Sequence, residues 1–483
     1  MKSRIKTIAV LLAAFGLASC SGPRTGGGGV GGGGTATFSV SLTDAPPAGI
    51  TVLTFNLTIT GVTLNPTTGT PVSLLTAPLT VDLARLSPDS IRLSSSSVPA
   101  GNYQTISVTV SNPVLTIVNQ SAAPLSGCAV NAVCKIPLTA AGSLTFNSAP
   151  FPLTLINGQQ TGVRLEFNLA NAITSTATTL AVDFTQPNVL KAISLPIAGL
   201  PAGQLDFFED YLGVVTAVNQ TTRSFTLQSL TRAPFQITAT ANTLTVFDDF
   251  PFNTSCPAPA FSCLALGQVL SADLVLNSDG TLTATEIEFL DPGTDDELEG
   301  IVTSVDTATQ FHIAVTDKLQ ASTGSLITGL GVGDPVIVTL TASPAFTVAA
   351  KGIPIPPAPL AVFQTSTDTG RMRPGETVEV RVKTFTAGTS GNPPTVSADR
   401  VRLRFTRVTA TVRVPVTGNF FNLANFPALF AITTTAQVQT FVPQTSFENV
   451  ASASALSSAD VVSIRALYIS SAPPFFAAKV RKR

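Results

Sequence analysis

A ten-residue pattern occurs twice in this chain, as Gly213-Val-Val-Thr-Ala-Val-Asn-Gln-Thr-Thr222 and as Gly300-Ile-Val-Thr-Ser-Val-Asp-Thr-Ala-Thr309. Each copy leads into an aromatic segment, Phe225-Thr-Leu227 in the first and Phe311-His-Ile313 in the second. A weaker third copy begins at Val408-Thr-Ala-Thr-Val412. β-branched and aromatic residues favour strands, and a pattern repeated at this spacing indicates a repeated structural unit. The sequence therefore predicts three copies of one small β-module.

A second signature follows in each copy, at Leu266-Gly267-Gln268-Val269, Pro374-Gly375-Glu376-Thr377-Val378 and Ser458-Ala459-Asp460-Val461. The order of these segments resembles small bacterial β-barrel domains (domain of unknown function 5666), which implies a short OB-like barrel. We expect equivalent residues to point inward: Val215 with Val302, Phe225 with Phe311, and Val269 with Val378. In the first copy Asn277-Ser-Asp-Gly280 has the composition of a hairpin turn. In the second, Val378, Val380 and Val382 predict a buried face, and Glu379, Arg381 and Lys383 a wet one; Arg402 and Arg404 are expected outside in the same way.

Residues 37–200 alternate in the same manner, with Val163, Leu165 and Phe167 on one face and Arg164 and Glu166 on the other. One buried and one wet face are typical of a sandwich of antiparallel sheets. At Gly61 the alternation changes phase, which suggests a bulge.

Three motifs in this region, Phe38-Ser-Val-Ser-Leu-Thr-Asp-Ala-Pro46, Val81-Asp-Leu-Ala-Arg-Leu86 and Val98-Pro-Ala-Gly-Asn-Tyr103, resemble the N-terminal module of a bacterial lipoprotein family (domain of unknown function 4382). The resemblance implies an envelope location and a β-sandwich-like fold, and it brings no known activity. Asp44 before Ala45-Pro46 fits an Asx turn better than a metal ligand.

The composition supports an all-β chain. Of its 483 residues 44% are hydrophobic and only 11% charged, with 35 Gly and 35 Pro as turn formers. The net charge of −1 provides no basic surface for nucleic acid. We predict an N-terminal β-sandwich-like domain followed by three small β-barrel-like repeats. The expected boundaries are 1–19 signal peptide, 20–36 glycine-rich tether, 37–200 sandwich, 206–291 first barrel repeat, 298–405 second, and 407–483 degenerate third.

The first residues predict export and lipidation. Lys2, Arg4 and Lys6 precede an apolar core from Ile8 to Leu17, which is too short to cross a bilayer and fits a signal peptide. Leu17-Ala-Ser-Cys20 resembles the bacterial lipobox, which implies acylation (palmitate) at Cys20 and a membrane-anchored protein of the cell envelope. Ser21, where Asp would favour inner-membrane retention, favours the outer membrane by the same analogy. An ordinary secreted protein with a chance cysteine is the alternative.

The other four cysteines occur as two close pairs, Cys128 with Cys134 and Cys256 with Cys263. In an oxidising compartment such pairs predict local disulfides. The spacing is not that of a zinc site.

Residues able to carry chemistry are few. His312, the only histidine, lies opposite apolar Phe311 and Ile313, so we expect it to face water. Acidic residues gather before two of the repeats, and linker acids of this kind are usually solvated. The first group is Asp206, Glu209 and Asp210; the second, which has oxygen ligands of the kind that calcium prefers, is Asp291, Asp295, Asp296, Glu297 and Glu299. A weak calcium site at the second group is the only metal hypothesis, and no cofactor is expected.

These observations favour a non-enzymatic envelope lipoprotein that acts as a surface scaffold, spacer or ligand-binding protein, with repeats that touch mainly their neighbours and project outward. A carbohydrate-binding or adhesive protein, with an extracellular glycan or protein as its ligand, is the first alternative. It is weakened by the absence of Trp and by only three tyrosines. An unrecognised envelope hydrolase is the second alternative, and it would require a deep cleft with two facing carboxylates.

Overall fold

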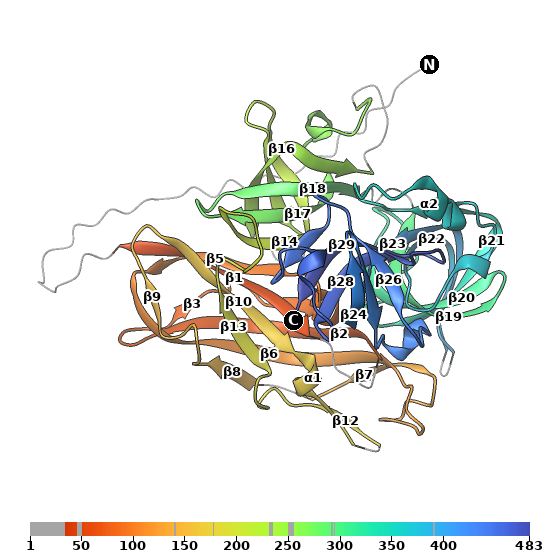
Figure 1. Cartoon of the computed structure of the whole chain (residues 1–483), viewed down its shortest axis with the longest axis horizontal. Helices are drawn as coiled ribbons and strands as arrows, with labels where there is room; N and C mark the ends of the chain where they lie inside the picture. The colour runs from red at the N-terminus through yellow and green to blue at the C-terminus, as the bar shows by residue number, and fades with distance from the viewer. Residues whose placement is uncertain are drawn as a thin grey trace, which may run out of the picture. The chain divides into compact units, whose positions relative to one another are not determined.

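The computed structural model describes residues 34–45, 51–139, 142–176, 178–230, 235–249, 256–290, 293, 295–389 and 392–483. The expected signal peptide with Cys20 and most of the expected tether lie outside the described residues. The fold is all-β, with an N-terminal β-sandwich-like domain and three barrel-like modules, as the sequence predicts (Figure 1). Among the described residues no helix has the length and apolarity needed to cross a membrane.

Two sheets form the sandwich, and their inward residues make one core that includes Phe38, Phe55 and Phe167. The first sheet has the order β13-β10-β1-β5, with β1 (Thr35–Ala45), β5 (Ile91–Pro99), β10 (Gln160–Asn168) and β13 (Leu190–Ser194). The second sheet is built on β2 (Thr51–Pro66) and β6 (Gly101–Val118), flanked by β3 (Val72–Ser73), β4 (Leu79–Asp82), β7 (Val133–Pro137), β8 (Gly142–Phe146) and β9 (Leu153–Leu155). Short elements complete the domain: η1 (Ala84–Leu86), α1 (Leu169–Ala172), β11 (Ile173–Ser175) and β12 (Leu180–Val182).

The sandwich departs from the sequence prediction in one respect. Strand β1 pairs with β10 in parallel, so the first sheet is mixed and not antiparallel. The alternation of apolar and polar residues indicates which face of a strand is buried but not the direction in which the strand runs. For this reason the sequence did not show that β1 and β10 are parallel. The bulge at Gly61 is present, as a register shift between Ile59 and Gly61 in the β2–β6 pairing. Asp44 lies in β1, and its side chain is outside the described set.

The first two barrels share one strand order. Barrel 1 closes as β14-β15-β16-β18-β17, with β14 (Gln204–Asn219), β15 (Ser224–Ser229), β16 (Gln236–Asp248), β17 (Val269–Asn277) and β18 (Leu282–Leu290). Barrel 2 closes as β19-β20-β21-β23-β22, with β19 (Asp296–Thr307), β20 (Gln310–Leu319), β21 (Pro335–Val348), β22 (Thr377–Thr386) and β23 (Thr395–Arg404). In each barrel the third and fifth strands pair in parallel and close the ring.

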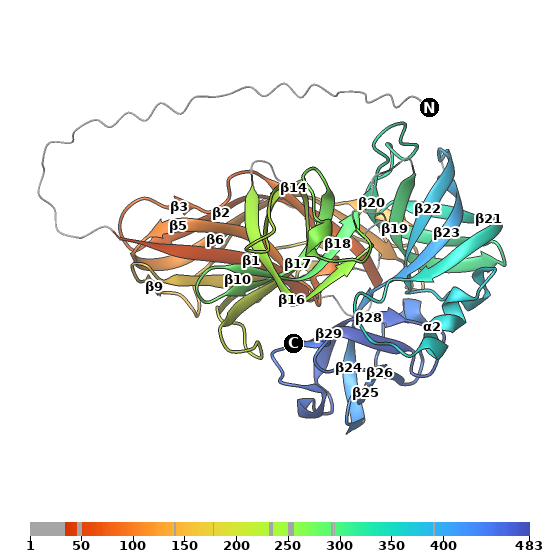
Figure 2. The ribbon, with the colours of Figure 1, turned by 90° about the horizontal axis from the view of Figure 1, so that it is seen from above.

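The third module has the same outline. Its strands are β24 (Thr406–Thr417), β25 (Phe420–Ala424), β26 (Ala436–Gln439), β27 (Ser446–Glu448), β28 (Val461–Tyr468) and β29 (Phe475–Lys482). β26 pairs with both β25 and β29, so β24, β25, β26, β29 and β28 form a ring. Both β26 and β27 pair in parallel with β29, and together they occupy the place of the single strand β16 or β21. Figure 2 shows this module and barrel 2 as separate groups of strands.

Between the strands of each module a short helical segment covers the barrel core: η2 (Phe261–Cys263) in barrel 1, α2 (Pro357–Gln364) with η3 (Thr369–Arg371) in barrel 2, and η4 (Ala428–Phe430) with η5 (Ala453–Ala455) in the third module. Phe261 packs near Phe225, and Phe363 packs against Phe346 with ring centroids 5.4 Å apart. Each module therefore has its own apolar core.

The repeated glycine that opens each barrel has a steric cause. A Cβ on Gly213 would lie 2.8 Å from the carbonyl oxygen of Gln228, and one on Gly300 would lie 2.7 Å from that of Ala314. Real Cβ atoms do not approach backbone this closely, so the neighbouring strand can pack here only against glycine.

One of the three expected equivalences is wrong. Val215, Val302, Phe225, Phe311 and Val378 are all buried, but Val269 is half-exposed. Gly213 pairs with Leu270 in barrel 1, whereas Gly300 pairs with Val378 in barrel 2, so Leu270 is the true equivalent of Val378. Because successive side chains of a strand point to opposite faces, the one-residue error reversed the predicted orientation.

The modules do not form a row in which each touches mainly its neighbours, which the sequence had suggested. The apolar core of barrel 2 continues into the third module through Phe441, Leu467, Ile469 and Phe476. The sandwich is joined directly to the third module by Arg164 of β10 and Glu448 of β27. Arg164, on a strand face expected to be wet, makes this contact with the third module.

Candidate functional site

The described residues bury an unusual number of charges for a chain with so few. Fifteen charged side chains are buried, although the whole sequence has only 27 basic and 28 acidic residues. Isolated buried charges are costly, so they are expected to occur in pairs. Most of these side chains meet where the sandwich, the two barrels and the third module come together. We call this cluster the ionic junction and define it by Arg85, Asp89, Arg164, Asp206, Glu209, Asp210, Asp273, Glu286, Glu288, Glu299, Lys351, Arg404, Arg407, Glu448, Arg465, Lys479 and Arg481.

Glu448 is the most connected carboxylate of the ionic junction. It lies 2.8 Å from Nη1 of Arg164 and 2.8 Å from Nζ of Lys479, and it accepts from Nε of Arg481 at 2.5 Å. Arg164 also pairs with Asp206 of barrel 1, and Lys479 also pairs with Glu209. All six side chains are at most 2% exposed. One carboxylate of the third module is thus connected to the sandwich directly and to barrel 1 through two cations.

Barrel 1 supplies only acids to the junction, and the other modules supply the bases. Asp210 is 3.3 Å from Nη2 of Arg85 in the sandwich and 3.0 Å from Nη2 of Arg407 in the third module. Asp273 pairs with Arg465 at 2.8 Å. Glu288 pairs with Arg404 of barrel 2 at 2.5 Å.

Lys351, three residues beyond the end of β21, completes the connection between the barrels at 2.9 Å from Glu286 and 3.0 Å from Glu288. The complementary charges fix which faces of the modules pack together.

Burial and pairing act on these pKa values in opposite directions. Burial by itself would raise the pKa of Glu448, but Arg164, Arg481 and Lys479 outweigh it and hold that pKa well below the ordinary value. At Glu209 burial dominates over the attraction of Lys479 and raises the pKa to about 8. Burial likewise raises the pKa of Glu286 to about 7 against the attraction of Lys351. The junction therefore contains carboxyls that titrate at very different pH values.

The acids that sequence analysis placed in solvated linkers are part of this cluster. Asp206, Glu209 and Asp210 lie within β14, and the first two are almost fully buried. Arg164 and Arg404, expected to face water, are 2% and 9% exposed. Alternation shows that a residue points away from its own core, and another module can still cover it. The sequence did contain one indication of these buried acids, since acidic residues precede the opening glycine of both barrels, Gly213 and Gly300.

Four of the five calcium candidates lie in the described part of the chain, and each of them is engaged by other partners. Asp295 pairs with Lys383 at 2.8 Å, and Glu297 pairs with Arg400. Asp296 accepts from the backbone N–H groups of Ala321 and Leu326, and Glu299 pairs with Arg85 and Arg404. Asp291 lies outside the described residues. Within the described part of the chain no group of three or more His, Cys, Asp or Glu side chains is placed to hold a metal ion.

Other sequence-predicted features have clear positions. Cys128 is bonded to Cys134 and Cys256 to Cys263. His312 is partly exposed, with its Nε2 atom 2.7 Å from Asp306. Asn277–Gly280 forms the β17–β18 turn, in which the backbone N–H of Gly280 donates to the carbonyl of Asn277 and Gly280 has a φ of +84°.

A cavity of about 320 Å³ adjoins the ionic junction, between the sandwich and the two barrels. It is lined by Asp82, Arg85, Asp89, Glu209, Asp210 and Asp317 together with apolar residues such as Phe208. Its carboxylates already have strong partners: Asp82 accepts from the N–H groups of Phe55 and Ala84, and the others pair with Arg85, Arg407 or Lys479. Each carboxylate that lines this cavity therefore has a partner within the protein.

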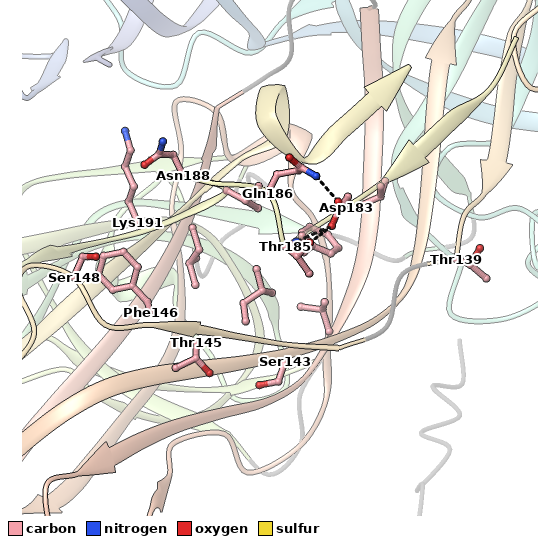
Figure 3. A pocket seen from close by; sticks show the side chains of 16 residues that line it. Thr139, Ser143, Thr145, Phe146, Ser148, Asp183, Thr185, Gln186, Asn188 and Lys191 are labelled. Atoms are coloured by element: carbon pink, nitrogen blue, oxygen red, sulfur yellow. Dashed lines mark hydrogen bonds between the residues drawn. The ribbon is translucent and has the colours of Figure 1, made fainter. Parts of the chain in front are cut away.

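A second cavity is an open groove of about 760 Å³ in the sandwich domain. Ser143, Leu144, Thr145 and Phe146 of β8 and Ser148 line one side, and residues 182–186 and 188–191 line the other. In Figure 3 Asp183, Thr185 and Gln186 form a small hydrogen-bonded group on the second side. The Asp183 carboxylate accepts from the N–H and hydroxyl of Thr185, and hydrogen bonds from Thr185 and Gln186 lower its pKa.

The fold defines an all-β protein of several modules that are joined by buried ion pairs. Comparison with known proteins agrees with the modules: residues 35–191 match the model of the Domain of unknown function (DUF4382), and residues 213–288 match that of the Domain of unknown function (DUF5666). The chain thus contains these two domains in this order.

No curated protein matches the chain. Among solved structures, "drosophila Unr CSD456" aligns over 57% of this chain and 97% of that chain, with 12% identity and a TM-score of 0.13. An alignment with this TM-score bears on neither fold nor function.

Proposed function

We propose that this protein is a non-enzymatic, lipid-anchored scaffold of the cell envelope, in which the ionic junction holds the four modules as one rigid body. The observation that carries the proposal is the position of Glu448, buried among cations from two modules and connected through them to a third. Removing one member of a buried ion network leaves unpaired charge in the interior, so each module strengthens the attachment of the others. A flexible array of independent domains would have no use for such a cluster.

The chemistry of the described residues favours a scaffold over the hydrolase alternative. Glu209 and Glu286, two buried carboxylates with raised pKa values, belong to ion pairs between modules, and the carboxylates that line the cavity beside them already have partners. The structure offers little support for the glycan-binding alternative. Tyr103 and Tyr468 are buried and cannot form a platform for a sugar ring, and Tyr211 is half-buried.

The anchor is the part of the proposal that rests on sequence, namely the Lys2–Leu17 segment and the lipobox ending at Cys20. The test is incorporation of radiolabelled palmitate by cells that express the Cys20→Ala variant, with Ser21→Ala as the matched control. We expect label in the control and in the wild type and none in Cys20→Ala, which should stay as uncleaved precursor. Equal labelling of Cys20→Ala would refute lipidation at this residue, and membrane fractionation of the wild type would then decide between an anchored and a secreted protein.

A further inference from the structure

The groove of the sandwich domain lies along a strand edge that has no partner among the described residues. β8 pairs only with β6, in the antiparallel register Ile106↔Phe146 to Val110↔Gly142. In an antiparallel strand alternate backbone N–H and C=O groups point to opposite sides, so part of those of β8 point away from β6. Over five residues this edge is about 17 Å long at ~3.4 Å per residue.

The apolar core is also open along this edge. Leu144 and Phe146 belong to the sandwich core but are only partly buried, as are Ile136 and Leu138 in the neighbouring segment. Across the groove from β8 lie the core residues Val182, Phe184 and Val189. A side chain that entered between the two walls would contact apolar atoms on both sides.

The outer residues of the groove are polar and almost uncharged. Ser143, Thr145 and Ser148 on the β8 side and Thr185, Gln186 and Asn188 on the other carry hydroxyls and amides. The charged lining residues are Asp183, whose carboxylate is engaged by Thr185 and Gln186, and Lys191 on β13. A strongly charged ligand would meet little opposite charge in the groove, whereas a neutral ligand would lose little solvation free energy on entering it.

From these three observations we propose that the groove binds an extended, neutral segment of a partner polypeptide, which adds as a strand to the free edge of β8. Its backbone pairs with the outward groups of β8, and its alternate apolar side chains enter between Leu144 or Phe146 and Val189. The remaining side chains lie beside Ser143 and Thr145 and are small or hydroxylated. Strand addition of this kind takes its affinity from the main chain and its specificity from alternate side chains. The inference goes beyond the scaffold proposal and needs neither the lipid anchor nor the ionic junction.

The probe is the peptide acetyl-Thr-Val-Thr-Val-Thr-Val-amide, fluorescently labelled and titrated into the full mature protein in detergent. Its control is the same peptide with alternate amides N-methylated, which keeps the side chains and removes hydrogen-bond donors. We expect saturable binding of the first peptide, at least about tenfold weaker binding of the second, and slower deuterium exchange at residues 142–146 in the complex. An Asn188→Arg variant, which fills the groove from an exposed position, should lose binding, and Thr221→Arg at an exposed turn of barrel 1 should not.

The opposite results would overturn the proposal. These are equal binding of both peptides, no saturable binding, unchanged exchange at residues 142–146, or full binding by Asn188→Arg. Association of the chain with itself through this edge, detected as a dimer that the peptide does not dissociate, would also overturn it. Circular dichroism shows whether Asn188→Arg is folded. If it is not, Thr185→Arg on the same side of the groove takes its place in the binding assay. None of these outcomes touches the scaffold proposal, which is tested at the ionic junction.

Discussion

Replacing Glu448 by glutamine removes one negative charge from the centre of the ionic junction at almost constant volume. Arg164, Lys479 and Arg481 would then share the remaining acceptors, and the new amide would direct N–H donors at groups that are themselves donors. Breaking a buried ion pair by removing one partner costs about 3–5 kcal/mol. Each cation keeps a second hydrogen-bond acceptor here, Asp206 for Arg164, Glu209 for Lys479 and backbone carbonyls for Arg481, so we expect the lower end, about 3 kcal/mol.

The assay is scanning calorimetry of the wild type and of Glu448→Gln, with Asp399→Asn as the matched control. Asp399 pairs with Arg381 at 2.8 Å on a surface of barrel 2 where the two side chains are 26% and 33% exposed. Exposed pairs contribute at most about 1 kcal/mol, so the control should melt close to the wild type and Glu448→Gln clearly below it.

The pH dependence has a definite sign. The pKa of Glu448 in the folded protein lies well below its ordinary value of 4.5. Its contribution is therefore present above that ordinary value and lost as the pH falls through the folded pKa. The difference between wild type and variant should be full at neutral pH and shrink only in acid. A Glu448→Gln protein that melts with the control at pH 7 would refute the reasoning.

Three further changes test other parts of the structure. Phe225→Ala should cost about 3–5 kcal/mol in unfolding free energy, as truncation of a buried Phe usually does; a loss below 1 kcal/mol in chemical denaturation would contradict its place in the core of barrel 1. Gly300→Ala should destabilise by about 1–3 kcal/mol because its Cβ would overlap the carbonyl oxygen of Ala314, whereas Gly329→Ala, which meets nothing within 4 Å, should leave the melting temperature unchanged. Glu209 has its folded pKa raised to about 8, so its contribution is present in acid and is lost as the pH rises; Glu209→Gln should remove up to about 1.4 kcal/mol per pH unit from the decline in stability between pH 5 and 8, and an unchanged decline would show that Glu209 is ionised throughout.

The strands and the repeat could be predicted because they depend on local order in the sequence. Alternation identified the inward residues of β22 and β23, and the two glycine-led copies, Gly213–Thr222 and Gly300–Thr309, aligned correctly. The second signature was misaligned by one residue at Val269, where the turn before the strand offers no alternating residues to fix the phase. Alternation also failed to show that β1 and β10 run in parallel.

The ionic junction could not be predicted, and the reason is physical. Arg164 and Glu448 are 284 residues apart, and nothing in either strand indicates what lies opposite its polar face. A side chain that points away from its own core is solvated in a lone module and buried in a packed one. Because the chain has few charged residues, those on the strands stand out in the sequence. The residues with which they pair can be identified only from the packing of the modules.

The most direct test of the scaffold proposal is whether the modules move as one body. Spin labels on Thr221→Cys in barrel 1 and Ser454→Cys in the third module, both exposed positions, report the distance between these modules by pulsed electron resonance. The proposal predicts one narrow distance distribution in the wild-type background and a broad one after Glu448→Gln. A broad distribution in the wild-type background, unchanged by Glu448→Gln, would contradict it.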